Sequence, residues 1–318
     1  MHYRQLTREQ RYVIYVENSR NATNKIIAEK IGVSESTVSR ELKRNRCANG
    51  RYMWLKADEQ AQARRSRTVR NHTVDGIARW RARELILSEQ WSPRQISGYL
   101  GKEGVRISHE TIYRMVREDE TGLLASNCRH GMKYRKRSAR SRQTKATNIR
   151  DRVSIHERPP EADGSRFGDW EMDTIIGKDG SGAILTLTER STNMLLMEKL
   201  KHGKHPVPLA KAVWRLLLPY AGDGLRTITT DNGSEFAGHR IITERLKVQV
   251  YFADSYCSWQ KGAIENANKL IRQYIPKGTD FNSITDRFIQ KVQHKINTRP
   301  REKLNFDTPL NCFYRHFY

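Results

Sequence analysis

A stretch of positive charge divides the chain and limits how it can fold. Between Arg129 and Arg152 the sequence has ten lysines and arginines but a single acidic residue, Asp151. Such a stretch has too few apolar side chains to bury a core, and the turn-rich residues 158–165 follow it. We therefore predict a basic linker over residues 125–166, with folded domains on both sides. A solvated spacer without a ligand is the alternative to a linker whose cations are neutralised by a bound polyanion.

The charge of the whole chain points to a polyanionic partner. The 318 residues include 58 basic and 35 acidic side chains, a formal net charge of +23. Residues 1–166 contribute 36 − 19 = +17, and residues 167–318 contribute 22 − 16 = +6. Nucleic acid is the first candidate partner and an anionic membrane the second.

The lack of long apolar runs weakens the membrane alternative. None approaches the roughly 18–20 residues of a spanning helix, and the first six residues contain no apolar signal-peptide core. We therefore expect a cytoplasmic protein. The four cysteines stand far apart, without a C-x-x-C pair, so neither a disulfide framework nor a zinc site is expected.

Residues 1–50 have the pattern of a helix-turn-helix. Thr7 and Gln10 form a capping box ahead of a helix that ends near Ser19, with Tyr12, Tyr15 and Val16 as its expected apolar stripe. A second helix is predicted over residues 24–31, a turn at Gly32, and a third helix over residues 35–45. The predicted DNA contacts at the start and on the outer face of the third helix are Ser34, Ser36, Thr37, Arg40, Lys43 and Arg44. The alternative is a small helical bundle with a solvated face.

A second, similar domain is predicted over residues 91–124, after connecting helices over residues 51–90. Ser92, Pro93 and Gln95 combine an N-cap, a proline in the first turn and a capping glutamine. A later helix is expected from His109 to Arg117. Its predicted DNA contacts are Ser108, His109, Thr111 and Arg114. A domain that only packs against the first one is the alternative. In the basic linker the candidate DNA contacts are Arg135, Lys136 and Arg137.

Beyond residue 166 the pattern changes to strands. Strands are predicted over residues 167–177, 183–189, 194–199, 227–230 and 248–252, and helices over residues 208–220, 241–246 and 261–275. This order suggests an α/β layer with a mixed central sheet over residues 167–318. In the first strand, period two places Asp169, Glu171 and Asp173 on one face.

Three carboxylates stand out within this frame. Asp173 lies in the first strand, Asp231 at the end of the fourth, and Glu265 near the start of a helix. Carboxylates that fold together in a basic protein repel one another unless a cation separates them, and hard divalent ions with oxygen ligands meet that need. Two Mg²⁺ ions about 4 Å apart are suited to phosphodiester chemistry. Lys269 and Arg272 follow Glu265 on the same helix side and are candidate phosphate contacts. For Asp231, an ordinary turn residue in Asp-Asn-Gly remains an equal alternative.

Several long motifs resemble a known family. They read GDWEMDTIIG at 168–177, TTDNGSEF at 229–236, YFADSYCSWQKGAIENANKLIRQYIPKGTDF at 251–281 and NTRPREKLNFDTP at 297–309. In the N-terminal half, IGVSESTVSRELKRN at 31–45 and WSPRQISGYL at 91–100 also match. In these motifs the chain resembles the DDE transposases of the insertion-sequence-thirty (IS30) family.

The resemblance implies a fold, a reaction and a set of site residues. It implies N-terminal helix-turn-helix domains followed by an RNase H-like catalytic core, and a catalytic, metal-binding triad at Asp173, Asp231 and Glu265. The implied activity is cleavage and joining of DNA strands with two Mg²⁺ ions, for which Mn²⁺ can substitute. Double-stranded DNA is the implied partner, both as terminal inverted repeats and as target, in a bacterial cytoplasm. Lys261, in a turn before the glutamate helix, is a further candidate DNA contact, and Glu171 either assists the metals or forms a salt bridge.

More than one class of DNA-binding protein fits these residues. A retroviral-type integrase would have an N-terminal His/Cys zinc domain, and no such pattern is present. A nuclease without strand transfer and a non-catalytic DNA-binding regulator both stay open. His294, Asn297 and Arg299 are additional polar candidates for DNA contact, with ordinary solvated positions as the default. Because an insertion sequence has a pair of inverted ends, we expect a homodimer or a larger synaptic complex.

Overall fold

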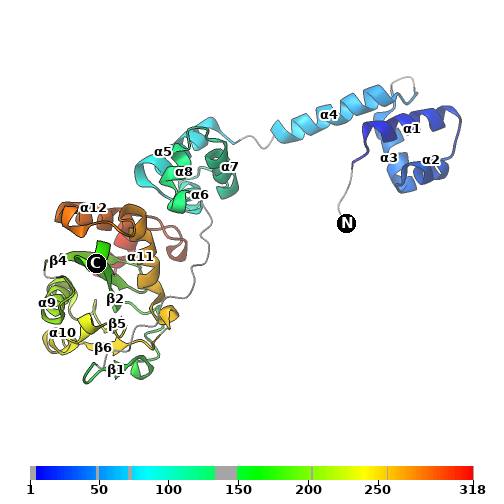
Figure 1. Cartoon of the computed structure of the whole chain (residues 1–318). Helices are drawn as coiled ribbons and strands as arrows, with labels where there is room; N and C mark the ends of the chain where they lie inside the picture. The colour runs from blue at the N-terminus through cyan, green and yellow to red at the C-terminus, as the bar shows by residue number, and fades with distance from the viewer. Residues whose placement is uncertain are drawn as a thin grey trace. The chain divides into compact units, whose positions relative to one another are not determined.

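The computed structural model describes residues 5–47, 50–70, 74–132, 149–201, 203–255 and 257–317, without the side chains of residues 66–70 and 130 (Figure 1). The chain divides into two compact units, Met1–Asp75 and Gly76–Tyr318. None of the helices described is long and apolar enough to cross a membrane.

The first unit is a helix-turn-helix with an additional long helix. It consists of α1 (Arg8–Ser19), α2 (Asn24–Ile31), α3 (Glu35–Asn45) and α4 (Trp54–Arg70). The predicted capping box at Thr7 is present, and Gly32 ends α2 with φ of 65°, a conformation that glycine adopts without strain. Ile14, Ile27 and Val38 are fully buried in the core between the first three helices.

The predicted apolar stripe of α1 is confirmed at Tyr15, which packs against the core, but not at Tyr12. Ile14 is the buried apolar residue of this helix, whereas 51% of the Tyr12 side chain is exposed. Arg11 is buried as well, because its guanidinium group forms ion pairs of 2.9 Å with Glu41 and 3.0 Å with Asp58. The face that points inward is therefore partly polar and is held by residues from α3 and α4.

The second unit begins with four helices. They are α5 (Gly76–Glu89), α6 (Pro93–Lys102), α7 (His109–Glu118) and α8 (Leu123–Asn127), followed by the 3₁₀ turn η1 (Arg129–Met132). Ile86, Ile96 and Ile112 are fully buried, and the predicted capping box at Ser92 starts α6. The segment predicted as connecting helices is thus divided, because α4 belongs to the first unit and α5 to the second.

The predicted linker limits are too wide on both sides. The end of helix α8 and the turn η1 occupy residues 125–127 and 129–132. On the other side, Ile149 is buried in the core of the sheet domain, and strand β1 (Val153–Ser154) pairs with β6. Residues 133–148, which include the candidates Arg135, Lys136 and Arg137, lie outside the described residues.

The rest of the second unit is built on a mixed sheet. Its other strands are β2 (Asp169–Ile176), β3 (Ala183–Glu189), β4 (Leu195–Leu200), β5 (Thr227–Thr230) and β6 (Gln249–Phe252). The strand order is β1-β6-β5-β2-β3-β4. Strands β2, β3 and β4 form an antiparallel meander, and β5 and β6 continue the sheet in parallel. With helices on both faces, this is the RNase H-like arrangement that the family resemblance implied.

Two helical layers cover the sheet (Figure 1). One consists of α9 (Pro206–Leu217) and α10 (His239–Leu246), which pack on the face that contains Trp170 and Met172. The other consists of α11 (Gly262–Tyr274) and α12 (Asp286–Asn297), which pack on the face that contains Ile175 and Ile184. The last helix is α13 (Pro309–Tyr314). Alternation along β2 therefore directs Glu171 and Asp173 toward α11, as the period-two pattern predicted.

Candidate active site and DNA-binding surfaces

Two parallel strands bring the first two carboxylates to the same level. Glu171 of β2 is opposite Thr229 of β5. Two residues further along the chain in each case are Asp173, within β2, and Asp231, directly after the last residue of β5. Asp231 thus follows directly from a strand and is not an isolated turn residue. Its Oδ1 accepts a hydrogen bond of 2.9 Å from the backbone N–H of Gly233, which fixes the turn around it.

Helix α11 supplies the third carboxylate and is anchored to β2 at its first turn. Glu171 is buried and accepts a hydrogen bond of 2.8 Å from the backbone N–H of Ile264. Its other oxygen forms an ion pair of 2.9 Å with Arg190. Each oxygen of Glu171 thus has a partner, one in a salt bridge and the other at the start of α11. Glu265 lies one residue beyond this anchor.

The three carboxylates line one cavity of about 270 Å³. Asp173, Asp231 and Glu265 come from β2, the end of β5 and α11, and the loop after β6 contributes Asp254, Cys257 and Ser258. Residues 58 and 34 positions apart in the sequence thus meet as predicted. The cavity combines acidic side chains with apolar Ala253 and Ile264 at its wall.

Lys261 places an ammonium group among these carboxylates. Its Nζ lies 2.8 Å from Oδ2 of Asp231 and 3.8 Å from Oδ1 of Asp173. Burial opposes the charged form, but the two carboxylates outweigh it and raise the pKa of Lys261. The prediction that Lys261 contacts DNA does not fit this structure, because the side chain is buried and paired with acids.

Asp173 lies in the most constrained environment of the three. Burial raises the pKa of its carboxyl group to about 6, with the nearby charges of Asp231 and Glu235 acting in the same direction and Lys261 opposing them. Oδ2 accepts a hydrogen bond of 2.8 Å from Nδ2 of Asn268, and Oδ1 accepts one of 2.9 Å from the N–H of Thr174. A cation beside Asp173 would therefore find an oriented carboxylate.

The predicted phosphate contacts on α11 have partners of their own. Lys269 forms an ion pair of 2.7 Å with Glu265. Arg272 is half-buried and donates weak hydrogen bonds to the carbonyl oxygens of Pro276 and Ile176. Arg272 thereby contacts the end of β2, and Lys269 lies beside Glu265, which lines the carboxylate cavity.

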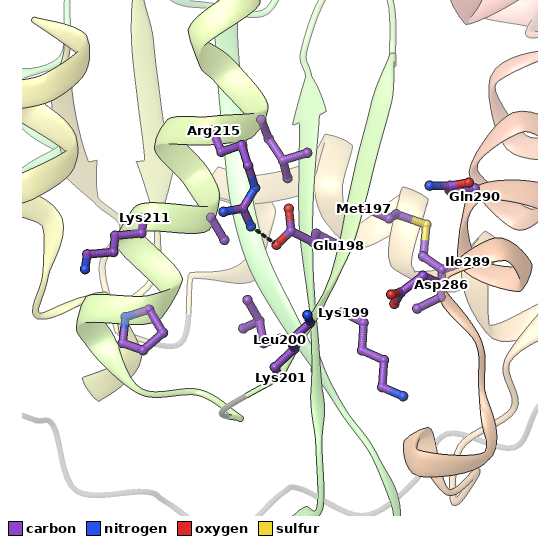
Figure 2. A pocket seen from close by; sticks show the side chains of 13 residues that line it. Met197, Glu198, Lys199, Leu200, Lys201, Lys211, Arg215, Asp286, Ile289 and Gln290 are labelled. Carbon is purple, nitrogen blue, oxygen red and sulfur yellow. Dashed lines mark hydrogen bonds and ion pairs between the residues drawn. The ribbon is translucent and has the colours of Figure 1, made fainter.

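A larger cavity, of about 540 Å³, lies elsewhere in the same domain (Figure 2). It opens between β4, α9 and α12, and Arg215 forms an ion pair with Glu198 inside it. Lys199, Lys201 and Lys211 line it together with the acids Glu198 and Asp286. None of the three predicted catalytic carboxylates lines this cavity, so its size does not make it the candidate site.

Helix α3 presents the predicted contacts of the first helix-turn-helix. Ser34, Ser36, Arg40, Lys43 and Arg44 are exposed, and Thr37 is half-buried. Ser34 precedes α3 without capping its backbone, because its hydroxyl group bonds those of Ser36 and Thr37. Beside α3, a cavity of about 440 Å³ is lined by arginines from α1, α3 and α4, namely Arg11, Arg40, Arg44, Arg64 and Arg65.

The outer face of α7 matches the prediction except at one residue. Ser108, His109 and Arg114 are exposed. Thr111 is buried, and its hydroxyl group lies 2.9 Å from that of Ser108, which also caps the helix. Thr111 therefore completes the N-terminal cap of α7, and the prediction that it contacts DNA is wrong.

Known proteins resemble this chain over nearly its whole length. A helix-turn-helix domain family matches residues 2–45. The transposase for insertion sequence element IS4351 of Bacteroides fragilis is 43% identical over 97% of this chain and 95% of its own length. The transposase InsI for IS30A of Escherichia coli strain K12 is 33% identical over 98% of this chain and 83% of its own length. The chain belongs to the IS30 family of insertion-sequence transposases.

A further relative agrees with this assignment. The transposase for IS1086 of Cupriavidus metallidurans is 34% identical over 97% of this chain and 94% of its own length. Among solved structures, the catalytic core domain of BIV integrase covers 47% of this chain with 16% identity and a TM-score of 0.38. The assignment rests on the sequence relatives alone. As an IS30-family transposase, the chain is a DNA-binding enzyme that cleaves DNA and transfers strands.

Sequence reasoning missed Glu235 and Asn268 at the candidate site and gave Lys261 a different role. Glu235 is buried, and its Oε1 accepts a hydrogen bond of 2.9 Å from the hydroxyl group of Thr174. Asn268 orients Asp173, and Lys261 pairs with Asp231. The motif TTDNGSEF contains Glu235, and Asn268 stands three residues after Glu265, one helical turn away. Helical spacing was thus the one signal that could have indicated Asn268.

Proposed function

We propose that this transposase cuts and joins DNA at the cavity lined by Asp173, Asp231 and Glu265, with Mg²⁺ as the cofactor. The observation that carries the proposal is that three carboxylates from separate elements line one cavity. Two Mg²⁺ ions are expected per site, and Mn²⁺ is expected to substitute for them. Bound divalent ions would make the attacking oxygen more nucleophilic and neutralise charge on the leaving oxygen.

The donor atoms in the cavity suit this cofactor. All three proposed ligands are carboxylates, the oxygen donors that hard divalent ions prefer. Asp173 and Asp231 already converge on a cation, the ammonium group of Lys261. Among the residues that the structure describes, no group of three or more His, Cys, Asp or Glu is arranged to hold a metal ion. Metal binding would therefore require Lys261 and Lys269 to release Asp231 and Glu265.

The remaining residues of the site would orient the carboxylates and the substrate. Asn268 holds Asp173 in one rotamer through its amide. Glu171 keeps the first turn of α11, and with it Glu265, against β2. Lys269 and Arg272 would hold phosphates of the strand that is cut, once Lys269 is free of Glu265. Water and then a DNA 3′-hydroxyl would serve as nucleophiles, so no covalent protein–DNA intermediate forms.

Two helical surfaces would bind the DNA. The first helix-turn-helix would read the terminal inverted repeats through the exposed residues of α3, and α7 would provide a second contact through His109 and Arg114. Phosphate contacts from arginine and lysine would give most of the affinity and would not depend on sequence. A two-fold assembly is proposed for the active form, because two inverted ends must be held together.

Labelled DNA that contains one end of the element tests the proposal. The full-length protein is incubated with this DNA and either Mg²⁺ or EDTA. Joined products that require Mg²⁺ are the expected result. Nicked but unjoined DNA would indicate a nuclease, and bound but uncut DNA a regulator.

The variant Glu265→Gln tests the role of the triad. It removes one charge and keeps the shape of the side chain. It should abolish cutting and joining, while end binding stays within about threefold of the wild type, less than 1 kcal/mol. Retained cutting would contradict the metal role of Glu265. Lost binding would show that Glu265 acts in DNA binding and not in chemistry.

A further inference from the structure

The helices α5–α8 are packed against the catalytic core at a point where nothing larger than glycine fits. A β-carbon added to Gly98 of α6 would lie 2.2 Å from Cδ1 of the Phe306 ring and 2.3 Å from Cε1 and Cγ. Ordinary carbon contacts are about 3.5–4.0 Å. The aromatic ring of Phe306 therefore rests directly on the backbone of α6.

The core holds Phe306 in an unusual conformation to make this contact. Asn305 and Phe306 have φ of 51° and 58°, in the left-handed region that a bulky residue rarely adopts. Arg301 fixes the turn, because its carbonyl oxygen accepts a hydrogen bond of 2.8 Å from the N–H of Phe306 and its N–H donates one of 2.9 Å to Asp307. The turn is thus shaped to present an aromatic side chain outward, toward α6.

A buried arginine joins the same two parts. Arg299 is 2% exposed. It donates hydrogen bonds of 2.8 Å to the carbonyl oxygen of Gln90, between α5 and α6, and to the hydroxyl group of Tyr274 in α11. Gln273 of α11 accepts another from Arg299 and donates to the carbonyl oxygen of Asn127 in α8. These bonds connect the helical domain to α11, the helix that also contains Glu265.

We propose that Gly98 and Phe306 form a positioning pair, which fixes the α5–α8 domain on the catalytic core so that DNA held by α7 meets the carboxylate cavity at one phosphate. The inference rests on the proposed function, because it assumes that α7 contacts DNA and that the cavity cuts it. Helix α7 packs on α6 in the same small domain. A rigid contact at Gly98 thereby fixes the exposed face of α7 relative to Glu265. Positioning within about 1 Å matters for such chemistry.

Two glycines of α6 provide a matched pair of variants. Gly98→Ala would drive a methyl group into Phe306, whereas a β-carbon at Gly101 meets nothing within 4 Å. Both changes replace a glycine of α6 by a better helix former, so Gly101→Ala is the control. Phe306→Ala removes the ring without overpacking, and the double variant Gly98→Ala/Phe306→Ala makes room for the new methyl group.

Hydrogen exchange of the full-length protein without DNA tests the docking. Gly98→Ala and Phe306→Ala should speed exchange of the amides in residues 301–307 by at least about tenfold. Gly101→Ala should leave these rates at the wild-type value, and the double variant should exchange more slowly than Gly98→Ala. Unchanged exchange in Gly98→Ala would overturn the docking, whatever the activity.

The positions of the nicks on labelled end DNA test the positioning role. In Gly98→Ala and Phe306→Ala the cuts should spread over several neighbouring phosphates, while binding through the first helix-turn-helix stays within about threefold of the wild type. The double variant should regain part of the accuracy. Cuts at a single phosphate in a variant with raised exchange would overturn the positioning role and leave the docking standing. If the wild type makes no cuts, the proposed function fails and the positioning role with it, whereas the exchange data still decide the docking.

Discussion

Lys261 donates a hydrogen bond of 2.8 Å from its ammonium nitrogen to Oδ2 of Asp231. This ion pair places a positively charged side chain of the protein in the acidic cavity. The same nitrogen lies 3.8 Å from Asp173. One positive charge is thereby shared between two carboxylates from adjacent strands, without a metal. Lysine and metal ions would then compete for the same oxygens, so Lys261 should set the metal concentration that the enzyme needs.

The first prediction is that Lys261→Gln makes folding depend on metal. In this variant the ammonium group of residue 261 is gone, so Asp173 and Asp231 repel each other. The free energy of unfolding in EDTA should therefore fall by about 1–3 kcal/mol. This is less than the roughly 3–5 kcal/mol for a fully buried pair, because 45% of the Asp231 side chain is exposed. Saturating Mg²⁺ should restore most of the loss, since a ligand that binds only the folded state stabilises it. Urea unfolding with Mg²⁺ and with EDTA measures both effects.

Lys269→Gln is the matched control for this experiment. Lys269 pairs with Glu265 at the surface, where an ion pair contributes little. Its free energy of unfolding in EDTA should therefore stay close to that of the wild type. An equal loss of stability in EDTA in both variants would show that the effect is general charge loss and not the pairing of Lys261.

The second prediction concerns the amide that orients Asp173. Asn268→Ala removes the hydrogen bond of 2.8 Å to Oδ2, so the carboxylate keeps the hydrogen bond from the N–H of Thr174 but loses the one that orients its second oxygen. Loss of such an orienting partner of a ligand typically costs about 10–100-fold in activity or metal affinity. We expect the rate of end cutting to fall by that factor at saturating DNA, with end binding unchanged. Single-turnover cleavage and a binding titration measure the two quantities.

Asn266→Ala provides the comparison on the same helix. Asn266 is exposed and two residues away, so the same change is made outside the hydrogen bond to Asp173. It should cut at the wild-type rate. If both variants slow equally, the loss comes from helix α11 and not from the orientation of Asp173.

Local sequence patterns predicted the elements of this fold well, because their signals are local. Capping residues at Thr7 and Ser92 and alternation of faces along β2 depend on neighbours within a few positions, and they are present as predicted. The cavity of three carboxylates, by contrast, depends on strand pairing between β2 and β5. Residue patterns alone left Asp231 undecided, and the family resemblance selected it.

The predictions that failed share a physical cause, which is contacts between residues far apart in the sequence. Arg11 is buried because Glu41 and Asp58 neutralise it, and no pattern within α1 indicates this. Strand β1 has only two residues and forms by pairing with β6, about a hundred positions later. It lies within the charged segment that was predicted as a linker, so the strand was not predicted. Asn297, a candidate DNA contact, instead bonds the backbone of Leu195 in β4.

The third prediction tests DNA contacts of the first helix-turn-helix through salt dependence. Arg40 and Arg44 are exposed on α3 beside an arginine-lined cavity. If each neutralises one phosphate, Arg40→Ala and Arg44→Ala should each reduce the slope of log K against log salt by about 0.9. Titrations of end DNA over a range of salt concentrations give the slope. Lys25→Ala, at an exposed position of α2, should leave it unchanged, and an equal reduction there would remove the assignment to α3.

The last prediction concerns the turn after β5, where Gly233 leaves room for two carboxylates. A β-carbon at this position would lie 2.7 Å from Oε2 of Glu235 and 3.0 Å from Oδ1 of Asp231. Gly233→Ala should therefore displace Asp231, and we expect at least about a tenfold loss of cutting rate with end binding intact. Gly262→Ala, where a β-carbon meets nothing within 4 Å, is the control near the same cavity and should cut normally. Wild-type cutting by Gly233→Ala would mean that Asp231 tolerates displacement, and its assignment as a metal ligand would then be wrong.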